Sequence, residues 1–238
     1  MDAVFFVLRT GCQWNALNAT GICSSSSAHR RFQEWTAAGV FVNLWAMGLR
    51  EYDELKGLDR EWLAMDGAMT KAPLGGERTG RNPTDRGKLG TKRSLLVEAN
   101  GIPVGLAVEG ADRHDKKVAE ATLESIPVER PEPTPESPQG MCLDKGYDDD
   151  DTRELVGEFG FTAHVRARGE EAKALKREAG FKARRWVVER THSWMNRFRR
   201  LLIRWEKKVD NYLAFLHLAC AHIVWKNCTL ADPSQVFG

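Results

Sequence analysis

The chain has few cysteines and no pattern that would pair them. There are five, an odd number, and no two of them form a Cys-x-x-Cys motif. Such a set predicts neither a disulfide framework nor a zinc knuckle, and a reducing cytoplasm is the expected compartment. The cysteines are Cys12, Cys23, Cys142, Cys220 and Cys228.

Export and membrane signals are lacking as well. Residues 1–8 are apolar but carry Asp2 and no basic segment, which is unlike a signal peptide. The apolar segment 209–225 is interrupted by Asn211, His217 and His222, so it is too short and too polar to span a bilayer. The glycines of the chain lack phosphate-loop spacing, and no ATP site is expected.

Neither sign of charge is in large excess, because 35 Lys and Arg stand against 33 Asp and Glu. The two signs are nevertheless separated along the chain. Acids gather at 129–136 and 148–158, and bases gather at 78–93 and 184–208. This separation fits a nucleic-acid-binding protein that keeps acids for metal ions. For any single charged run, an ordinary solvated surface is the alternative interpretation.

The hydrophobic pattern predicts a helical region followed by an α/β region. Three helices are expected in the first 58 residues, at 1–10, 26–38 and 40–56. They fit a helix-turn-helix DNA reader and a plain helical cap equally well. The division predicted from the pattern is a helical region, 1–58, and a catalytic domain, 59–230.

The second region alternates strands with helices, which is typical of an α/β domain. Asn100-Gly101 is a strong hairpin signal between two of its strands. A basic loop is expected at 73–90 and a proline-rich loop at 127–140. The expected strands are 61–70, 93–98, 102–108, 141–145 and 161–165. The expected helices are 115–125, one capped by Asp149 or Asp150, 183–204 and 209–227.

Three acids in different settings point to metal chemistry. Asp66 and Asp144 each end a predicted strand, and Glu189 lies in a basic helical stretch. Ligands collect at the carboxyl ends of central strands in open sheets, so the two aspartates would face one another if their strands were neighbours. Carboxylates are the ligands that Mg²⁺ prefers, and two such ions can clamp a phosphoryl displacement. Taken singly, each acid could equally be a cap or a surface charge.

The predicted helix 183–204 has two distinct faces. Apolar residues recur at helical spacing and form the face expected to be buried: Val187, Trp194, Phe198 and Leu201. The opposite face carries groups that bind phosphate well: Arg185, Glu189, His192, Ser193, Asn196 and Arg200. An amphipathic helix whose arginines serve solubility is the alternative.

These residues resemble the bacterial insertion-sequence transposases of the DDE class, in the IS-four/IS-five superfamily and most like its IS-five branch. The resemblance covers nearly the whole chain and rests on an ordered set of motifs. They are Ala64-Met65-Asp66-Gly67, Gly90-Thr91-Lys92-Arg93-Ser94-Leu95-Leu96-Val97, Ala111-Asp112-Arg113-His114-Asp115, Leu143-Asp144-Lys145-Gly146-Tyr147 and Arg185-Trp186-Val187-Val188-Glu189-Arg190-Thr191.

The resemblance implies a ribonuclease-H-like α/β catalytic domain, a mixed sheet with flanking helices, preceded by a small helical region. It implies that Asp66, Asp144 and Glu189 are the catalytic triad and bind Mg²⁺ or Mn²⁺, as two ions. The Arg-x-x-x-Glu spacing at Arg185 and Glu189 matches the superfamily signature. Lys182 and Asn196 stand where the superfamily often has Tyr and Lys, which blurs the subgroup.

The implied reaction is cleavage at the terminal inverted repeats of an insertion sequence, followed by joining of the 3′-hydroxyl ends to target DNA. No nucleotide cofactor and no covalent protein intermediate are expected. The expected partners are DNA and further copies of the chain, with no membrane, in the nucleoid of the bacterial cytoplasm. The residues expected to bind DNA are Lys92, Arg93, Arg185, Arg190, Arg197 and Arg200. The accessory residues expected are His114, Asp115, His192 and Asn196.

Two other functions remain open from the sequence. Relatives begin several tens of residues earlier, so the amino-terminal module is expected to be incomplete. A truncated, non-catalytic DNA-binding remnant is therefore the first alternative. The second is a metal nuclease that acts on structured DNA and needs no end sequence.

Overall fold

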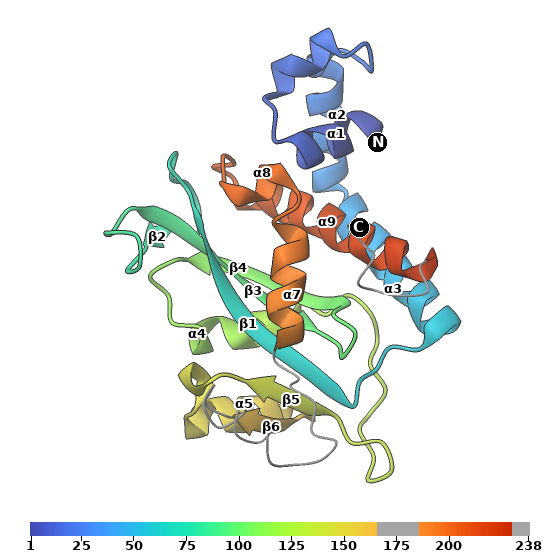
Figure 1. Ribbon diagram of the computed structural model, residues 1–238, viewed down its shortest axis with the longest axis vertical. Helices are drawn as coiled ribbons and strands as arrows, with labels where there is room; N and C mark the ends of the chain where they lie inside the picture. Colours follow the sequence, from blue (N-terminus) through green and yellow to red (C-terminus); the bar gives the residue numbers. More distant parts are fainter. Residues whose placement is uncertain (166–185, 230–238) are drawn as a thin grey trace.

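The computed structural model describes residues 1–165 and 186–229. Its amino-terminal helices lie at one end, and a mixed sheet lies beside them with helix α7 crossing it (Figure 1). One hydrophobic core runs through both parts, from Val4 and Trp45 to Met65 and Phe215. Among the described residues, every helix is too short or too polar to cross a membrane.

The amino-terminal region forms α1 (Asp2–Thr10), the 3-10 helix η1 (Trp14–Ala19), α2 (Ser25–Ala37) and α3 (Val40–Lys56). Helix α1 ends at Gly11, whose φ of 72° is left-handed and whose N–H donates to the Val7 carbonyl. Helix α2 begins where the Ser24 side chain accepts a hydrogen bond from the Ser27 N–H. The three helices expected from the hydrophobic pattern are therefore confirmed.

Helix α3 joins this region to the rest of the protein. It packs along α9 (Val209–Thr229), and the two helices lie side by side in Figure 1. Gly48 permits the close approach, because a Cβ there would lie 2.8 Å from Nε1 of Trp225. The buried indole of Trp45 donates to the Pro103 carbonyl at 2.9 Å, so α3 is also tied to the sheet.

The sheet contains β1 (Trp62–Lys71), β2 (Gly80–Arg81), β3 (Leu89–Val97), β4 (Pro103–Gly110), β5 (Gly140–Leu143) and β6 (Thr162–Val165). The strand order is β4-β3-β1-β5-β6, and the short β2 also pairs with β3. Strand β3 is antiparallel to β1 and β4, whereas β5 and β6 are parallel to β1. This order and these directions make the sheet ribonuclease-H-like, as expected.

Helices cover both faces of the sheet. The remaining elements are α4 (Lys116–Glu124), η2 (Lys145–Tyr147), α5 (Asp150–Glu158), α7 (Trp186–Met195) and α8 (Arg199–Leu202). Arg93 of β3 reaches α7 at His192, and Ser94 accepts a hydrogen bond from Thr122 of α4. Neighbouring residues of a strand point to opposite faces, so α7 and α4 lie on opposite sides of the sheet.

Two sequence-based expectations were wrong in detail. The helix expected at 183–204 ends at Met195, and α8 follows only after a turn; residues 183–185 lie outside the described residues. The turn allows Phe198 to pack edge-on against Phe5 and His222. The expected basic loop 73–90 contains a strand, β2, because its chain pairs with the start of β3. The proline-rich stretch before β5 is irregular, as expected.

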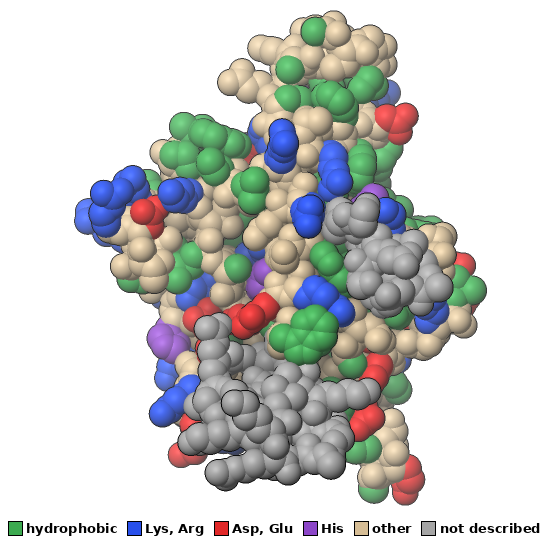
Figure 2. All heavy atoms as spheres, in the orientation of Figure 1, with side chains coloured by type: hydrophobic (Ala, Val, Ile, Leu, Met, Phe, Trp, Pro, Cys, Tyr) green, Lys and Arg blue, Asp and Glu red, His purple; other side chains and the backbone are tan. Residues whose placement is uncertain are grey.

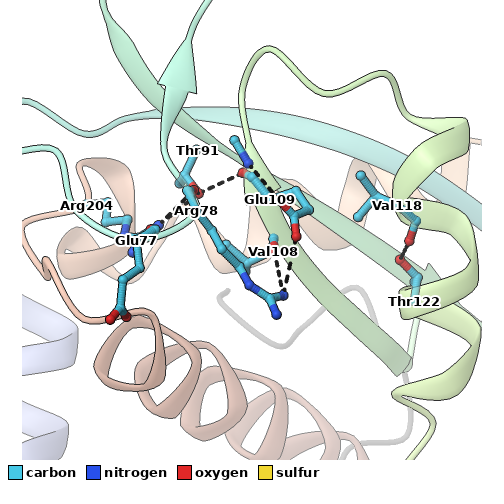
Figure 3. Close-up of polar contacts among 9 residues, drawn as sticks. Glu77, Arg78, Thr91, Val108, Glu109, Val118, Thr122 and Arg204 are labelled. Atoms are coloured by element: carbon cyan, nitrogen blue, oxygen red, sulfur yellow. Dashed lines mark hydrogen bonds and ion pairs between the residues drawn. The ribbon is translucent and has the colours of Figure 1, made fainter.

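A buried arginine anchors the chain that leads into β2. The side chain of Arg204 is fully buried and donates to the carbonyls of Glu77 at 2.7 Å and Arg78 at 3.2 Å, and to Thr91 Oγ1 at 3.1 Å. Arg78 in turn donates to the Val108 carbonyl at 3.1 Å (Figure 3). These contacts tie the basic loop to β3 and β4.

A buried glutamate closes the hairpin between β3 and β4. Glu98 Oε1 accepts hydrogen bonds from the N–H groups of Asn100 at 2.8 Å and Ile102 at 3.0 Å, and Oε2 accepts one from the Asp59 N–H at 3.2 Å. Burial raises the pKa of Glu98 to about 7, although the hydrogen bonds act in the opposite direction. The folded protein therefore binds this proton more tightly than the unfolded chain does.

We expect the stability of the protein to fall with rising pH because of Glu98. The stabilisation is complete below the ordinary pKa of 4.5 and is lost as the pH rises through the folded value of about 7. Between pH 4.5 and pH 8, the free energy of unfolding of the wild type should fall by roughly 3 kcal/mol more than that of Glu98→Gln. Urea unfolding at several pH values measures this difference, and parallel profiles would contradict the prediction.

Candidate active site

Two aspartates lie level with one another on neighbouring parallel strands. Strands β1 and β5 pair in parallel, with Ala64 opposite Cys142, and Asp66 and Asp144 each follow two residues later. The condition for the two aspartates to face one another, that their strands are neighbours, is therefore met. Asp66 does not end its strand, however, because β1 continues to Lys71 in its pairing with β3. Asp66 thus lies level with the residue that follows the end of β5. Beyond this point, β1 no longer pairs with β5.

Backbone donors hold both carboxylates. Asp66 Oδ1 accepts from the Gly67 N–H at 2.8 Å, and Asp144 Oδ1 accepts from the Gly146 N–H at 2.7 Å. The side chain of Asp144 thereby caps η2. Charge-assisted hydrogen bonds of this kind are strong and orient the carboxylates.

A third acid, Asp115, lies against the same strand. A Cβ at Gly67 would lie 2.1 Å from Asp115 Oδ1, so the lack of a side chain there makes room for Asp115. Lys92 Nζ, itself buried, lies 3.1 Å from Asp115 Oδ1. His114, the other residue of this pair, is exposed. Asp115 therefore lies against β1 next to Gly67, and Lys92 compensates its charge.

The charges of all three aspartates act on the buried side chain of Tyr147. Burial, followed by the negative charges of Asp115, Asp66 and Asp144, raises the pKa of Tyr147 well above its ordinary value. All three carboxylates therefore lie near enough to Tyr147 for their charges to act on its hydroxyl. We call Asp66, Asp115 and Asp144, which come from β1, the start of α4 and the end of β5, the acidic locus.

Glu189 is exposed on α7, which packs on β1 and β3. The helix is anchored on either side of this residue. Thr191 Oγ1 donates to the Gly101 carbonyl at 2.7 Å, and Arg190 donates to the Asn100 carbonyl. These two hydrogen bonds attach α7 to the β3–β4 hairpin turn. The Arg190 guanidinium also lies 4.6 Å from the ring centre of Trp186.

His192 is buried against β1 beside Asp66, although it was expected on the exposed face of the helix, whereas Asn196, expected on the same face, is exposed. Arg93 is fully buried and donates through Nη2 towards His192 Nδ1 at 3.3 Å and Asn196 Oδ1 at 3.2 Å. His192 Nε2 lies 3.3 Å from the Asp66 carbonyl oxygen. Burial, and then the positive charge of Arg93, lower the pKa of His192 to about 3, so this histidine is neutral at physiological pH.

The donor set suits a hard divalent cation, although it is not a preformed cage. Within residues 1–165 and 186–229, no three Asp, Glu, His or Cys side chains lie close enough together to enclose an ion. The carboxylates of Asp66 and Asp144 are nevertheless level on adjacent strands, and carboxylate oxygens are what Mg²⁺ and Mn²⁺ bind in proteins. Glu189 projects from the helix that contacts the Asp66 peptide through His192.

Several arginines and lysines expected to bind DNA are engaged inside the protein. Lys92, Arg93 and Arg200 are buried, and Arg200 pairs with Glu206 at 2.7 Å. They do not fit phosphate contacts, because these cations are already used by the fold. Arg197 is exposed and Arg190 is half-buried, while Arg185 lies outside the described residues.

The basic residues that are accessible lie in the loop around β2 instead. Arg81, Arg86 and Lys88 are all exposed. On the face shown in Figure 2, Lys and Arg side chains gather over the β2 end of the sheet, and acidic side chains lie nearer α7. The charge density of 78–93 signalled this loop, but only the covering of both faces of β3 distinguishes the buried Lys92 and Arg93 from the exposed residues.

Comparison with known proteins places the chain in a family. Residues 57–224 match the family model described as Transposase DDE domain, and residues 1–45 match the one described as Putative transposase of IS4/5 family. The chain therefore belongs to the transposase DDE family, whose members cut DNA and transfer strands. The family uses divalent metal ions.

Two curated relatives come from Burkholderia cepacia. The Putative transposase for insertion sequence element IS402 is 36% identical over 163 residues, which are 67% of this chain and 74% of that protein. The Insertion element IS402 uncharacterized 16.2 kDa protein is 31% identical over 84 residues, which are 35% of this chain and 57% of that protein.

Solved structures of the Mos1 mariner transposase are also similar. Its strand transfer complex aligns with a TM-score of 0.33 and 11% identity, covering 97% of this chain and 78% of that one. Its catalytic domain aligns with a TM-score of 0.34 and 10% identity, covering 81% and 92%.

Proposed function

We propose that this transposase cuts DNA at the terminal inverted repeats of its own insertion sequence and joins the 3′-hydroxyl ends to target DNA. Asp66, Asp144 and Glu189 would hold two Mg²⁺ or Mn²⁺ ions for both steps. The observation that carries the proposal is the placement of Asp66 and Asp144 level on adjacent parallel strands, with the helix of Glu189 in contact with the Asp66 peptide.

Each residue of the site has a role in this scheme. Asp66 and Asp144, oriented by the Gly67 and Gly146 N–H groups, would present oxygens to the metal ions from the sheet, and Glu189 would do so from α7. Bound metal ions supply Lewis acidity at the phosphate and stabilise the attacking and leaving oxygens. Lys92 holds Asp115 against β1 and compensates the charge of that acid.

The exposed basic residues would guide the DNA towards these acids. Arg81, Arg86 and Lys88 lie on the loop around β2, and Arg197 and Arg199 lie where α7 turns into α8. Contacts of this kind go to phosphates and carry little sequence information. Affinity should therefore fall steeply with salt for any duplex, and charge removal at these positions should flatten that dependence.

End recognition would require the amino-terminal helices and a second copy of the chain. We propose that residues 1–58 contribute to reading the terminal repeat, while 59–230 carry the chemistry. Because α3 packs on α9 and Trp45 bonds to Pro103, the helical region would move with the catalytic domain rather than independently of it. Two copies would be needed to hold two ends together, as expected for a homo-oligomer on DNA.

A cleavage and joining assay tests the proposed function. Purified protein is incubated with a labelled duplex carrying the terminal repeat, a target plasmid and Mg²⁺ or Mn²⁺. We expect cuts at the repeat boundary and joined products, both lost in Asp144→Asn and retained in Asp151→Asn, which alters an exposed acid of α5. A duplex with a scrambled repeat should be neither cut nor joined.

Three other outcomes would contradict the proposal in different ways. End binding without cleavage would favour a non-catalytic DNA-binding remnant. Equal cleavage of the scrambled duplex would favour a metal nuclease without end specificity. Activity that survives in Asp144→Asn would remove Asp144 from the site.

A further inference from the structure

His192 connects the two elements that carry Asp66 and Glu189. Its ring lies three residues after Glu189, one turn further along α7, and its Nε2 lies 3.3 Å from the carbonyl oxygen of Asp66 on β1. The contact reaches the backbone of Asp66 itself, not a neighbour. A shift of α7 along or away from β1 would therefore break this contact as it changed the spacing between the two carboxylates.

The partners of the imidazole determine which nitrogen carries the proton. A guanidinium can only donate, so Nδ1 must accept the hydrogen bond from Arg93 Nη2. A carbonyl oxygen can only accept, so Nε2 must carry the hydrogen and donate it to Asp66. The network is consistent in only one form, a neutral imidazole protonated at Nε2.

Arg93 is an unusual residue to find at this depth. It is 1% exposed, and its Nε and Nη1 have no hydrogen-bond partner among the described residues. Burying a charge without full compensation is costly, and an apolar side chain of similar volume would usually serve a core equally well. Arg93 Nη2 contacts His192 Nδ1 and also Asn196 Oδ1, the latter at 3.2 Å. Orienting His192 is a role that accounts for a buried arginine at this position.

We propose that His192, oriented by Arg93, is a positioning residue that sets the spacing of Asp66 and Glu189 and thereby the metal affinity of the site. The inference rests on the proposed metal-binding role of those two acids. Arg190 and Thr191 fix α7 to the β3–β4 turn, and His192 fixes it to β1 at the Asp66 peptide. Partners one step removed from a metal commonly change metal affinity or activity by about 10–100-fold when they are replaced.

The test measures Mn²⁺ affinity by calorimetry and by the metal-induced rise of the unfolding temperature, neither of which requires cleavage. His192→Phe keeps a ring and removes both polar atoms, and it should weaken Mn²⁺ binding by about tenfold or more. His192→Gln keeps one donor and one acceptor and should recover most of that loss. His217→Leu is the matched control, because this half-buried histidine stacks on Trp45, away from the acids, and its replacement should leave the affinity within about twofold of wild type.

Single-turnover cleavage against Mn²⁺ concentration provides a second readout. In His192→Phe the half-saturating concentration should rise, and the rate at saturating Mn²⁺ should recover towards wild type, because the ligands themselves are intact. If His192→Phe does not fold, Arg93→Met tests the same network from its other end and should weaken Mn²⁺ binding at least about threefold.

The possible failures are distinguishable. Wild-type affinity in a folded His192→Phe protein, or an equal loss in His217→Leu, would overturn the positioning role alone. If Asp66→Asn and Glu189→Gln bind Mn²⁺ as the wild type does, or if the wild type binds none, the proposed triad fails and the inference fails with it.

Discussion

Replacing Glu189 with glutamine should lower the rate of end cleavage at least about a thousandfold, which corresponds to roughly 4 kcal/mol of transition-state stabilisation. The amide keeps the size and most of the hydrogen-bonding capacity of the side chain but loses the negative charge that a hard cation requires. Glu189 is exposed at the surface of α7, so its replacement should leave the fold and the affinity for a terminal-repeat duplex nearly unchanged.

The measurement is a single-turnover cleavage rate, accompanied by duplex binding in the presence of Ca²⁺. Glu154→Gln provides the control, because it removes one negative charge from an exposed position of α5 without approaching the acids. A loss of less than about tenfold in Glu189→Gln, or a comparable loss in Glu154→Gln, would remove Glu189 from the proposed triad.

Replacing Arg204 with methionine should cost about 3 kcal/mol of unfolding free energy. The change removes the donors to the Glu77 and Glu206 carbonyls and to Thr91 Oγ1, whereas the Arg78 carbonyl keeps the Thr91 hydroxyl as a donor. Each buried acceptor left unpaired costs about 1–3 kcal/mol, and removal of a costly buried charge offsets part of the sum.

The loss would also free the loop that carries β2, because Arg204 holds its start against β3 (Figure 3). We therefore expect faster proteolysis within 73–90 as well as a lower midpoint in urea. Arg199→Met, at an exposed position of α8, should change the unfolding free energy by no more than about 0.5 kcal/mol. Equal stability of the two variants would show that Arg204 is no anchor.

The acids of the site were predictable, whereas the cations around them were not. Asp66 and Asp144 follow short apolar runs, which local sequence identifies, and the structure places them level with one another. Lys92, Arg93 and Arg200 looked like phosphate ligands because a basic side chain at the end of a charged run is usually exposed. Their burial depends on which residues of distant elements compensate them, such as Asp115 and Glu206.

The carboxyl-terminal helices were likewise predicted in part from the sequence. Helical spacing correctly predicted that Val187, Trp194, Phe198 and Leu201 are buried. It also predicted one continuous helix, and the chain instead turns after Met195. The spacing of apolar residues shows which side chains face the core. It does not reveal a turn after which the chain packs against the same core, because the apolar spacing is then almost unchanged.

The sequence by itself determined the kinds of elements, the Asn100-Gly101 hairpin and the order of the acids, because these depend on propensities and spacings within a few residues. Only the tertiary structure decided that β1 lies between β3 and β5, and that His192 and Arg93 meet beneath Asp66. Such contacts join residues about a hundred positions apart. Their energies come from packing and from the pairing of buried charges, which no local pattern encodes.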